Sequence, residues 1–396
     1  MRRLALVFCC VVLLALNGAG CAAGGADTYK VGYLSSQTGA YTALGLPSLE
    51  GAQLKVKQIN EAGGINGKQI ELIAVDDKGT STDTALGAQK LIEEGVITLA
   101  SATATALSHA AIPILNDNET PGLIISGTGL INDQLGKWVF KPSASEYDYI
   151  PLPLRYLRDD MGVTTIAAMI ENSGYGEGGQ HYLEIIAPEM GMEIVETQHF
   201  DPGATDMTPQ LANIRSSGAD SILIWGSGPA GALAIKQARE MGIMLPIATT
   251  PAQSSLTYYE AFREAYEMEP SPACLDNKPS IWPQLPDSDP DKAMCRQFEE
   301  DFNAEFGRIP GIYEAIGYSF MTFIADGLER ADPDVGDLAT ARSQLRDAYE
   351  ETENLSVIIG TYTMSPDDHY GRVVPKEVLV SFVNGEKVLV RTHDDL

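Results

Sequence analysis

Strand-like and helix-like patterns alternate regularly along the first third of the chain, and this order constrains the fold more than any other feature. Strand patterns cover residues 29–34, 68–75, 96–100 and 122–126, and helix patterns between them cover 49–61, 82–94 and 107–115. Parallel neighbouring strands need a crossover connection, which a helix supplies. The order therefore predicts an α/β fold, with a parallel sheet covered by helices on both faces.

The same order starts again after residue 142, so a second α/β unit of similar size is expected. Its helix patterns cover 149–161, 178–190 and 209–216, and its strand patterns cover 164–170, 193–199 and 221–225. A chain of 396 residues is long enough for two hydrophobic cores. Past residue 268 three further helices are expected, over 292–306, 313–330 and 338–350. Two alternating runs around Asn384-Gly385 then predict a hairpin with a type I′ turn.

The stretch Ser221–Gly242 places glycines 226, 228 and 231 between a strand pattern and a helix pattern. G-x-G-x-x-G in this position is typical of dinucleotide-binding proteins, which also need an acidic residue roughly 20 positions further on. The next strand, Leu245–Thr250, is followed by Pro251-Ala-Gln and has no Asp or Glu at its end. The sequence therefore favours a strand-to-helix turn over a ligand cleft, where small residues expose backbone N–H groups. A dinucleotide-dependent oxidoreductase is the less favoured alternative.

The first twenty residues have the features of an export signal. Basic residues at positions 2 and 3 precede the apolar run Leu4–Leu16, which is too short to span a bilayer, and Gly18-Ala-Gly precedes Cys21. A cysteine in this position resembles that of a bacterial lipoprotein signal, which predicts lipidation of Cys21 and a short tether over residues 21–26. An ordinary cleaved signal peptide is the alternative, because Gly18 stands where such signals usually carry leucine. We expect a periplasmic or cell-surface protein that is lipid-anchored to the membrane.

Two cysteines, Cys274 and Cys295, remain beyond the signal and the lipidation site. An even number of cysteines in an exported chain predicts one disulfide, here closing a proline-rich loop. Two free buried thiols are the alternative.

Charge and motif content exclude several other functions. The chain carries 54 acidic and 27 basic residues, a net charge of −27 with no basic cluster, so nucleic-acid binding is not expected. The five histidines lack metal-ligand spacing. Asp287-x-Asp-x-Asp291 has the start of a calcium loop, but Lys292 and Phe298 stand where that loop needs Gly and Glu. No G-x-S-x-G nucleophile motif occurs. We therefore expect neither an enzyme nor a site for a metal or cofactor.

Several stretches carry a family resemblance: VGYLSSQTGAYTALG, EGAQLKVKQINEAGGINGKQIELIAVDD and FDPGATDMTPQLANIRSSGADSILIWG. With further matches they extend over about residues 29–392, and the chain resembles type I periplasmic solute-binding proteins of the branched-chain amino acid (Leu/Ile/Val)-binding group, which serve ABC importers. The resemblance implies two Rossmann-like lobes with parallel sheets, joined by a three-crossover hinge and closing on a small ligand. The N-terminal lobe would contain residues 27–141 and 270–362, and the C-terminal lobe residues 142–269 and 363–396.

The resemblance also implies a set of ligand-binding residues. The loops after the third and fourth strands would offer hydroxyls and backbone groups to a ligand carboxylate; these are Ser101, Thr103, Ala104 and Thr105, then Ser126, Thr128 and Gly129. Neutral donors at helix starts can hold an anion without a full counter-charge. Helix capping is the alternative role for these hydroxyls. Tyr175 and Tyr313 correspond to aromatic residues of the cleft, and Tyr41 either lines its mouth or packs on its own lobe.

Two departures from the family pattern concern the ligand. Ala252 stands where the amino-acid binders have an acidic residue that holds the ligand ammonium, and Gly228 replaces a tyrosine and leaves room for a larger group. Burying an ammonium without an acidic partner is costly, so we expect an uncharged or carboxylate-only ligand, such as an amide or an aromatic acid. The function implied is the monomeric substrate-binding component of an ABC importer, working with permease subunits in the membrane. A ligand-sensing receptor of the same fold is the alternative.

Overall fold

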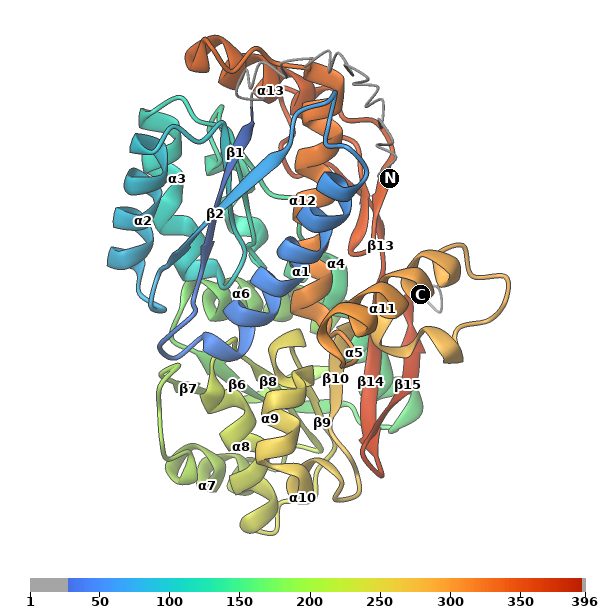
Figure 1. Ribbon diagram of the computed structural model, residues 1–396. Helices are drawn as coiled ribbons and strands as arrows, with labels where there is room; N and C mark the ends of the chain where they lie inside the picture. Colours follow the sequence, from blue (N-terminus) through green and yellow to red (C-terminus); the bar gives the residue numbers. More distant parts are fainter. Residues whose placement is uncertain (1–27, 394–396) are drawn as a thin grey trace, which may run out of the picture.

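The computed structural model describes residues 28–393 and shows two α/β lobes, one above the other in Figure 1. The expected signal peptide, the Cys21 lipidation site and the tether lie outside the described residues. The first lobe is built on a five-stranded parallel sheet of order β2-β1-β3-β4-β5. Its strands are β1 Tyr29–Ser35, β2 Ile70–Asp76, β3 Thr98–Ser101, β4 Gly122–Ile124 and β5 Val139–Phe140.

Helices cover both faces of this first sheet, as the strand–helix alternation predicts. One face is covered by α2 Ser81–Glu93 and α3 Thr105–Asp117, and the other by α1 Thr42–Glu61 together with α12 Ile312–Ala331, which returns from late in the chain. The late helices α11 Lys292–Phe306 and α13 Leu338–Glu350 complete this lobe. A small antiparallel sheet extends the α12 side; its strands are β11 Leu355–Val357, β12 Gly360–Tyr362 and β13 Arg372–Pro375.

The second lobe contains a seven-stranded sheet of order β15-β14-β10-β9-β8-β6-β7. Its strands are β6 Thr165–Glu171, β7 Glu193–Phe200, β8 Ser221–Trp225, β9 Ile247–Thr249, β10 Ala273–Asn277, β14 Glu377–Val383 and β15 Glu386–Thr392. Five of them run parallel, whereas the β14–β15 hairpin pairs antiparallel to β10. The sheet is therefore mixed rather than wholly parallel. Asn384 and Gly385 join β14 to β15 with φ of 51° and 90°, which confirms the predicted type I′ turn.

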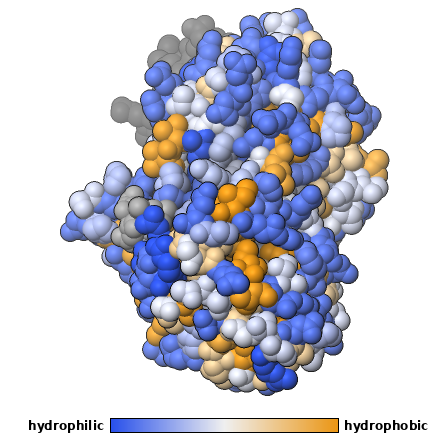
Figure 2. Space-filling model, turned by 180° about the vertical axis from the view of Figure 1, so that it is seen from behind, coloured by the Kyte–Doolittle hydropathy of each residue, from blue (hydrophilic) through white to orange (hydrophobic). Residues whose placement is uncertain are grey.

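Three longer and four shorter α-helices accompany the described part of this second sheet. The longer ones are α6 Gly174–Glu189, α7 Thr208–Ser217 and α8 Pro229–Glu240, and the shorter ones are α4 Glu146–Tyr149, α5 Pro151–Arg155, α9 Leu256–Ala261 and α10 Arg263–Tyr266. None of the helices between residues 28 and 393 has the run of apolar residues that a bilayer crossing requires. The face of the molecule in Figure 2 is largely hydrophilic, with a group of apolar side chains near the waist between the lobes.

The chain crosses between the lobes three times, but two of the crossings come later than the boundaries expected at 270 and 363. The first follows β5, as expected. The second follows β10, because residues 273–277 pair with β9 and β14 in the second lobe. The third lies at Lys376, because β13 still pairs with β12 in the first lobe. Each hinge segment thus continues a sheet up to the crossing, where buried backbone groups keep their hydrogen bonds.

The predicted disulfide is wrong, since Cys274 and Cys295 are both free and buried. Cys274 lies in the core of the second lobe, on β10 opposite Val380 of β14. Cys295 lies on α11, close to the charged groups of Lys278 and Asp291. A central strand and a helix hold the two thiols in separate environments, and burial raises the pKa of both.

Candidate ligand-binding site

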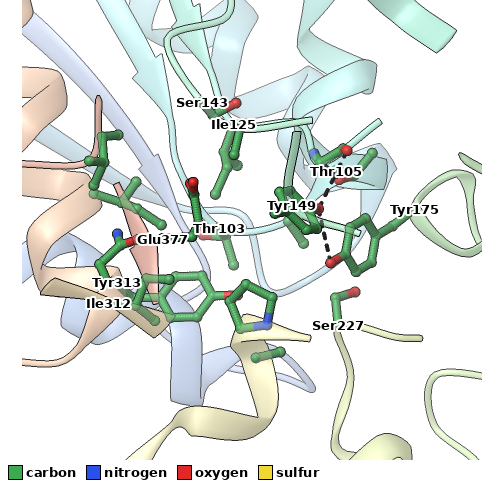
Figure 3. A pocket seen from close by; sticks show the side chains of 18 residues that line it. Thr103, Thr105, Ile125, Ser143, Tyr149, Tyr175, Ser227, Ile312, Tyr313 and Glu377 are labelled. Atoms are coloured by element: carbon green, nitrogen blue, oxygen red, sulfur yellow. Dashed lines mark hydrogen bonds between the residues drawn. The ribbon is translucent and has the colours of Figure 1, made fainter. Parts of the chain in front are cut away.

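A cavity lies between the lobes, at the carboxyl ends of strands from both sheets (Figure 3). Lining residues follow β3, β4, β8 and β9, which is where ligands of open α/β sheets are expected to bind. Its empty volume is ≈ 680 Å³, which includes open solvent at the mouth. It is lined by Thr103, Ala104, Thr105, Ile125, Gly127, Ser143, Ala144, Tyr149, Tyr175, Ser227, Pro251, Ala252, Asn277, Ile312, Tyr313, Ile316, Ile359 and Glu377.

The start of α3 presents hydrogen-bond donors to this cavity. Ala104 is the N-cap residue and offers no side chain to the first N–H groups of the helix. The Thr103 hydroxyl accepts a hydrogen bond from the Ser36 N–H (3.1 Å), and the Thr105 hydroxyl accepts one from the Gly127 N–H (3.0 Å). These two hydroxyls therefore brace neighbouring loops rather than cap α3, and each keeps a proton that it can donate. Together with the helix start, they favour a ligand carboxylate or carbonyl.

Aromatic side chains form one wall of the cavity. Tyr149 stacks on Trp225 with ring centroids 5.6 Å apart, and its hydroxyl lies 3.1 Å from that of Tyr175. Burial raises the pKa of both tyrosines well above the usual value, so both hydroxyls stay protonated. Since Tyr149 donates to Tyr175, the Tyr175 proton is left for another acceptor. Tyr313, at the start of α12, lines the opposite side, and burial raises its pKa too.

Of the predicted loop residues, three lie beside the cavity in supporting positions. Ser101 is buried; its carbonyl oxygen accepts a hydrogen bond from the Ser108 hydroxyl (2.9 Å), which also lies 3.2 Å from the Ser101 hydroxyl. Ser126 exchanges backbone hydrogen bonds with the Ser143 hydroxyl, and its own hydroxyl lies 2.9 Å from His109 Nε2. The Thr128 hydroxyl accepts from the Leu130 N–H. Thr128 thereby caps the 3₁₀ helix Gly129–Gln134, which is the alternative role that the sequence left open, whereas Ser101 and Ser126 contact neighbouring loop and helix residues.

Of three further predicted residues, Gly129 and Tyr41 mark contacts between the lobes, whereas Gly228 contacts its own lobe. The Gly129 N–H donates to Glu146 Oε2 (3.0 Å), across the first crossing. Tyr41 is buried close to the Ser227 side chain of the second lobe, and burial raises its pKa to about 12. Gly228 does not line the cavity: a Cβ there would lie 2.7 Å from the Pro202 carbonyl oxygen. Ser227, one residue earlier, faces the cavity instead, because successive extended residues point to opposite sides.

The turn that carries the G-x-G-x-x-G pattern already holds an anion of the protein itself. The Glu171 carboxylate, at the end of β6, accepts hydrogen bonds from the N–H groups of Ser227 and Gly228, both at 2.9 Å. It also accepts from the hydroxyls of Ser227 (3.0 Å) and Ser173 (2.7 Å). A buried carboxylate therefore occupies the position that a pyrophosphate would need at the start of α8. Sequence reasoning missed Glu171, although an acidic residue at a strand end is a usable signal.

The crossings contribute residues that sequence reasoning also missed. Ser143 comes from the first crossing, Asn277 from the end of β10 and Glu377 from the start of β14. Arg372 Nη2 lies 2.6 and 2.7 Å from the two carboxylate oxygens of Glu377, so the single acidic side chain in the lining is already paired. The lining contains no Lys, Arg or His. The cavity thus combines neutral donors, apolar walls and one neutralised carboxylate.

A cavity enclosed by two α/β lobes and reached by all three crossings defines a two-lobed solute-binding protein. A model of the family described as periplasmic binding protein matches residues 28–372. The chain belongs to this family, which confirms the resemblance and the fold inferred from the sequence.

Known proteins with similar sequences and structures agree with this assignment. The chain is 24% identical to the leucine-, isoleucine-, valine-, threonine- and alanine-binding protein of Pseudomonas aeruginosa, over 77% of this chain and 79% of that one. It is 23% identical to Leu/Ile/Val-binding protein homolog 4 of Brucella abortus, over 91% and 86% of the two chains. Its fold matches an extracellular ligand-binding receptor from Rhodopseudomonas palustris, with a TM-score of 0.83, 23% identity and coverage of 92% and 100%.

Proposed function

We propose that this protein is the extracytoplasmic substrate-binding component of an ABC importer and that it captures a small solute between its lobes. One observation carries the proposal: a single cavity takes its lining from both lobes and from all three crossings. A ligand in that cavity contacts both lobes at once, so ligand binding and lobe closure are coupled. Because ligand binding favours the closed form, a membrane permease can recognise the loaded protein by that form.

Direct contacts between the lobes support a closed conformation of the described chain. The Gly129 N–H donates to Glu146, and the Tyr149 hydroxyl lies 3.5 Å from the Gly127 carbonyl oxygen. The Tyr41–Ser227 contact adds a third link between the lobes. Apolar contacts accompany these polar ones, because Ala252 and Tyr258 of the second lobe belong to the same buried cluster as Tyr313 of the first lobe. A bound ligand would add contacts to both lobes and so favour closure further.

Sequence relatives and the cavity lining point to overlapping ligand classes. The relatives are named for leucine, isoleucine and valine, and those amino acids are the first compounds to test. Their carboxylate matches the donors at Thr103 and Thr105, and the apolar walls match their side chains. A partner for their ammonium group is less evident, because Glu377 is already paired with Arg372. We therefore favour an uncharged or carboxylate-only ligand of similar size.

Location and assembly are part of the same proposal. The sequence pattern around Cys21 supports a lipid anchor on the outer side of the cytoplasmic membrane, which would hold the protein near its permease. We propose that it works as a monomer, since one chain supplies the whole cavity lining.

A thermal-shift screen tests the proposal. Amino acids, amides and aromatic acids are added to the purified protein, and at least one compound is expected to raise the melting temperature, by more as its concentration rises above its Kd. Ala144→Phe fills the cavity from the first crossing and should abolish that shift, whereas Ala339→Phe, on the exposed side of α13, should leave it intact. Equal shifts in the two variants would refute binding in this cavity.

A further inference from the structure

Asn277 and Glu377 form a pair on the cavity wall at the second and third crossings. They are direct partners in the antiparallel ladder between β10 and β14, and opposite residues in such a ladder project to the same face. Both line the cavity, with exposed fractions of only 3% and 4%. An amide and a carboxylate are thus placed together in an otherwise mainly apolar region of the cavity, beside Ile312 and Ile359.

Glu377 retains the capacity to accept another hydrogen bond. A carboxylate offers about four acceptor positions. Arg372 Nη2 uses one on each oxygen, and between residues 28 and 393 no other side chain donates to this carboxylate. The remaining acceptor positions are therefore open to a ligand, and the Asn277 side chain beside them can donate or accept.

The charge around this pair favours an uncharged donor over an ammonium group. The Arg372 side chain is 1% exposed and pairs with Glu377 at close range, while Asp148 Oδ2, on a side chain that is 20% exposed, lies 3.5 Å from its other terminal nitrogen. A ligand ammonium beside Glu377 would also lie close to this buried guanidinium, and like charges repel strongly where water is excluded. A hydroxyl or an amide N–H can use the same acceptor without that cost.

The pair lies at the other side of the cavity from the donors at Thr105 and Tyr175. In Figure 3 Glu377 appears beside Ile312 and Tyr313, well separated from Thr105, Tyr149 and Tyr175. The two sides of the cavity therefore have opposite preferences: one donates to an acceptor, and the other accepts from a donor. Thr103 appears between the two sides in Figure 3, and isoleucines such as Ile125 and Ile316 supply apolar parts of the lining.

We propose that Asn277 and Glu377 form a specificity-determining subsite that binds an uncharged hydroxyl or amide N–H of the ligand. The ligand is then a two-ended molecule, with a carboxylate or carbonyl group at the α3 side, an apolar body, and a neutral donor at the crossings. This inference rests on the proposed function, since it assumes that the cavity is the binding site.

Three matched pairs of compounds test the inference by isothermal titration: 4-hydroxybenzoate and benzoate, 4-hydroxyphenylacetate and phenylacetate, and 6-hydroxyhexanoate and hexanoate. In at least one pair the hydroxylated member should bind the unmodified protein roughly tenfold more tightly or better, since one hydrogen bond to a charged group is worth about 1.5–3 kcal/mol. Glu377→Gln and Asn277→Ala should each reduce that ratio severalfold. Glu386→Gln, an exposed Glu on the same hairpin, is the matched control and should leave it unchanged.

Several outcomes would overturn the inference. These are an unchanged ratio in both subsite variants, no binding of any of the six compounds, or tighter binding of leucine than of every hydroxylated compound. The Asn277→Ala variant leaves the Glu377–Arg372 pair in place, so it remains informative if Glu377→Gln does not fold. The proposed function has a separate test. It fails if, for every compound of the wider thermal-shift screen, Ala144→Phe and Ala339→Phe give equal shifts.

Discussion

Lys141, at the first crossing, is expected to make the stability of the protein depend on pH. Its side chain is fully buried, with Nζ 2.7 Å from the Ser145 hydroxyl and 4.1 Å from the centroid of the Tyr370 ring. Burial lowers the pKa of this lysine from 10.5 to about 7, although the nearby carboxyls of Glu146 and Asp148 act in the opposite direction. The ammonium form is therefore disfavoured in the folded state relative to the unfolded chain.

The sign of the pH dependence follows from this difference. Between pH values of about 7 and 10.5 the unfolded chain binds a proton at Lys141 that the folded protein does not, so the free energy of unfolding rises with pH. The slope is about 1.4 kcal/mol per pH unit, or about 3 kcal/mol between pH of about 7.5 and 9.5. Below a pH of about 7 both states bind the proton, and the full cost of the buried charge is present.

Replacing Lys141 with Met tests this reasoning, because methionine fills a similar volume and cannot titrate. Urea unfolding followed by tryptophan fluorescence gives the free energy of unfolding at each pH. Between pH of about 7.5 and 9.5, the free energy of unfolding of the unmodified protein should rise by about 3 kcal/mol relative to that of Lys141→Met. Lys90, whose side chain is 63% exposed, provides the control. The free energy of unfolding of Lys90→Met should change with pH in parallel with that of the unmodified protein. Parallel curves for Lys141→Met as well would refute a depressed pKa at this site.

Two other predictions concern the second lobe. Gly179→Ala should lower the free energy of unfolding by about 1–3 kcal/mol, because a Cβ there would lie 2.1 Å from the Trp225 ring. Gly203→Ala is the control, because a Cβ at that position meets no atom within 4 Å. An equal loss of stability in both variants would contradict the packing argument. Glu171→Ala should uncover the N–H groups at the start of α8, so that inorganic phosphate raises the melting temperature of this variant but not of the unmodified protein. A phosphate effect of the same size on both proteins would show that Glu171 does not block an anion site.

Much of the fold could be predicted because its elements depend on local patterns. Alternating apolar residues mark the strands, and helix patterns between parallel strands require crossovers, so both lobes could be inferred before their contacts were known. The Asn384-Gly385 turn is a further local feature that the structure confirms. The boundaries at 270 and 363 were less accurate, because sheet membership of β10 and β13 depends on pairing with distant strands.

The site was predictable only in part. Thr103, Thr105, Tyr175 and Tyr313 line the cavity as the family resemblance implies, because each follows a strand end or starts a helix at the inter-lobe face. The prediction of Gly228 was wrong by one residue, because Ser227 lines the cavity instead. Sequence spacing alone does not determine which side of an extended segment faces the cavity. Helix-start and strand-end patterns thus locate the loops of a site more reliably than individual side chains.

By itself the sequence determined the α/β elements and their order, because short-range periodicity and local turn chemistry suffice for these features. The family followed from the resemblance of longer stretches of the sequence to known proteins. Only the tertiary structure decided that Glu171 fills the anion position of the glycine-rich turn and that the two cysteines stay apart. It also brought Asn277 and Glu377 together on one wall of the cavity. The physical reason is that side chains from segments about 100 residues apart meet only when the strands pair, and no local pattern records that register.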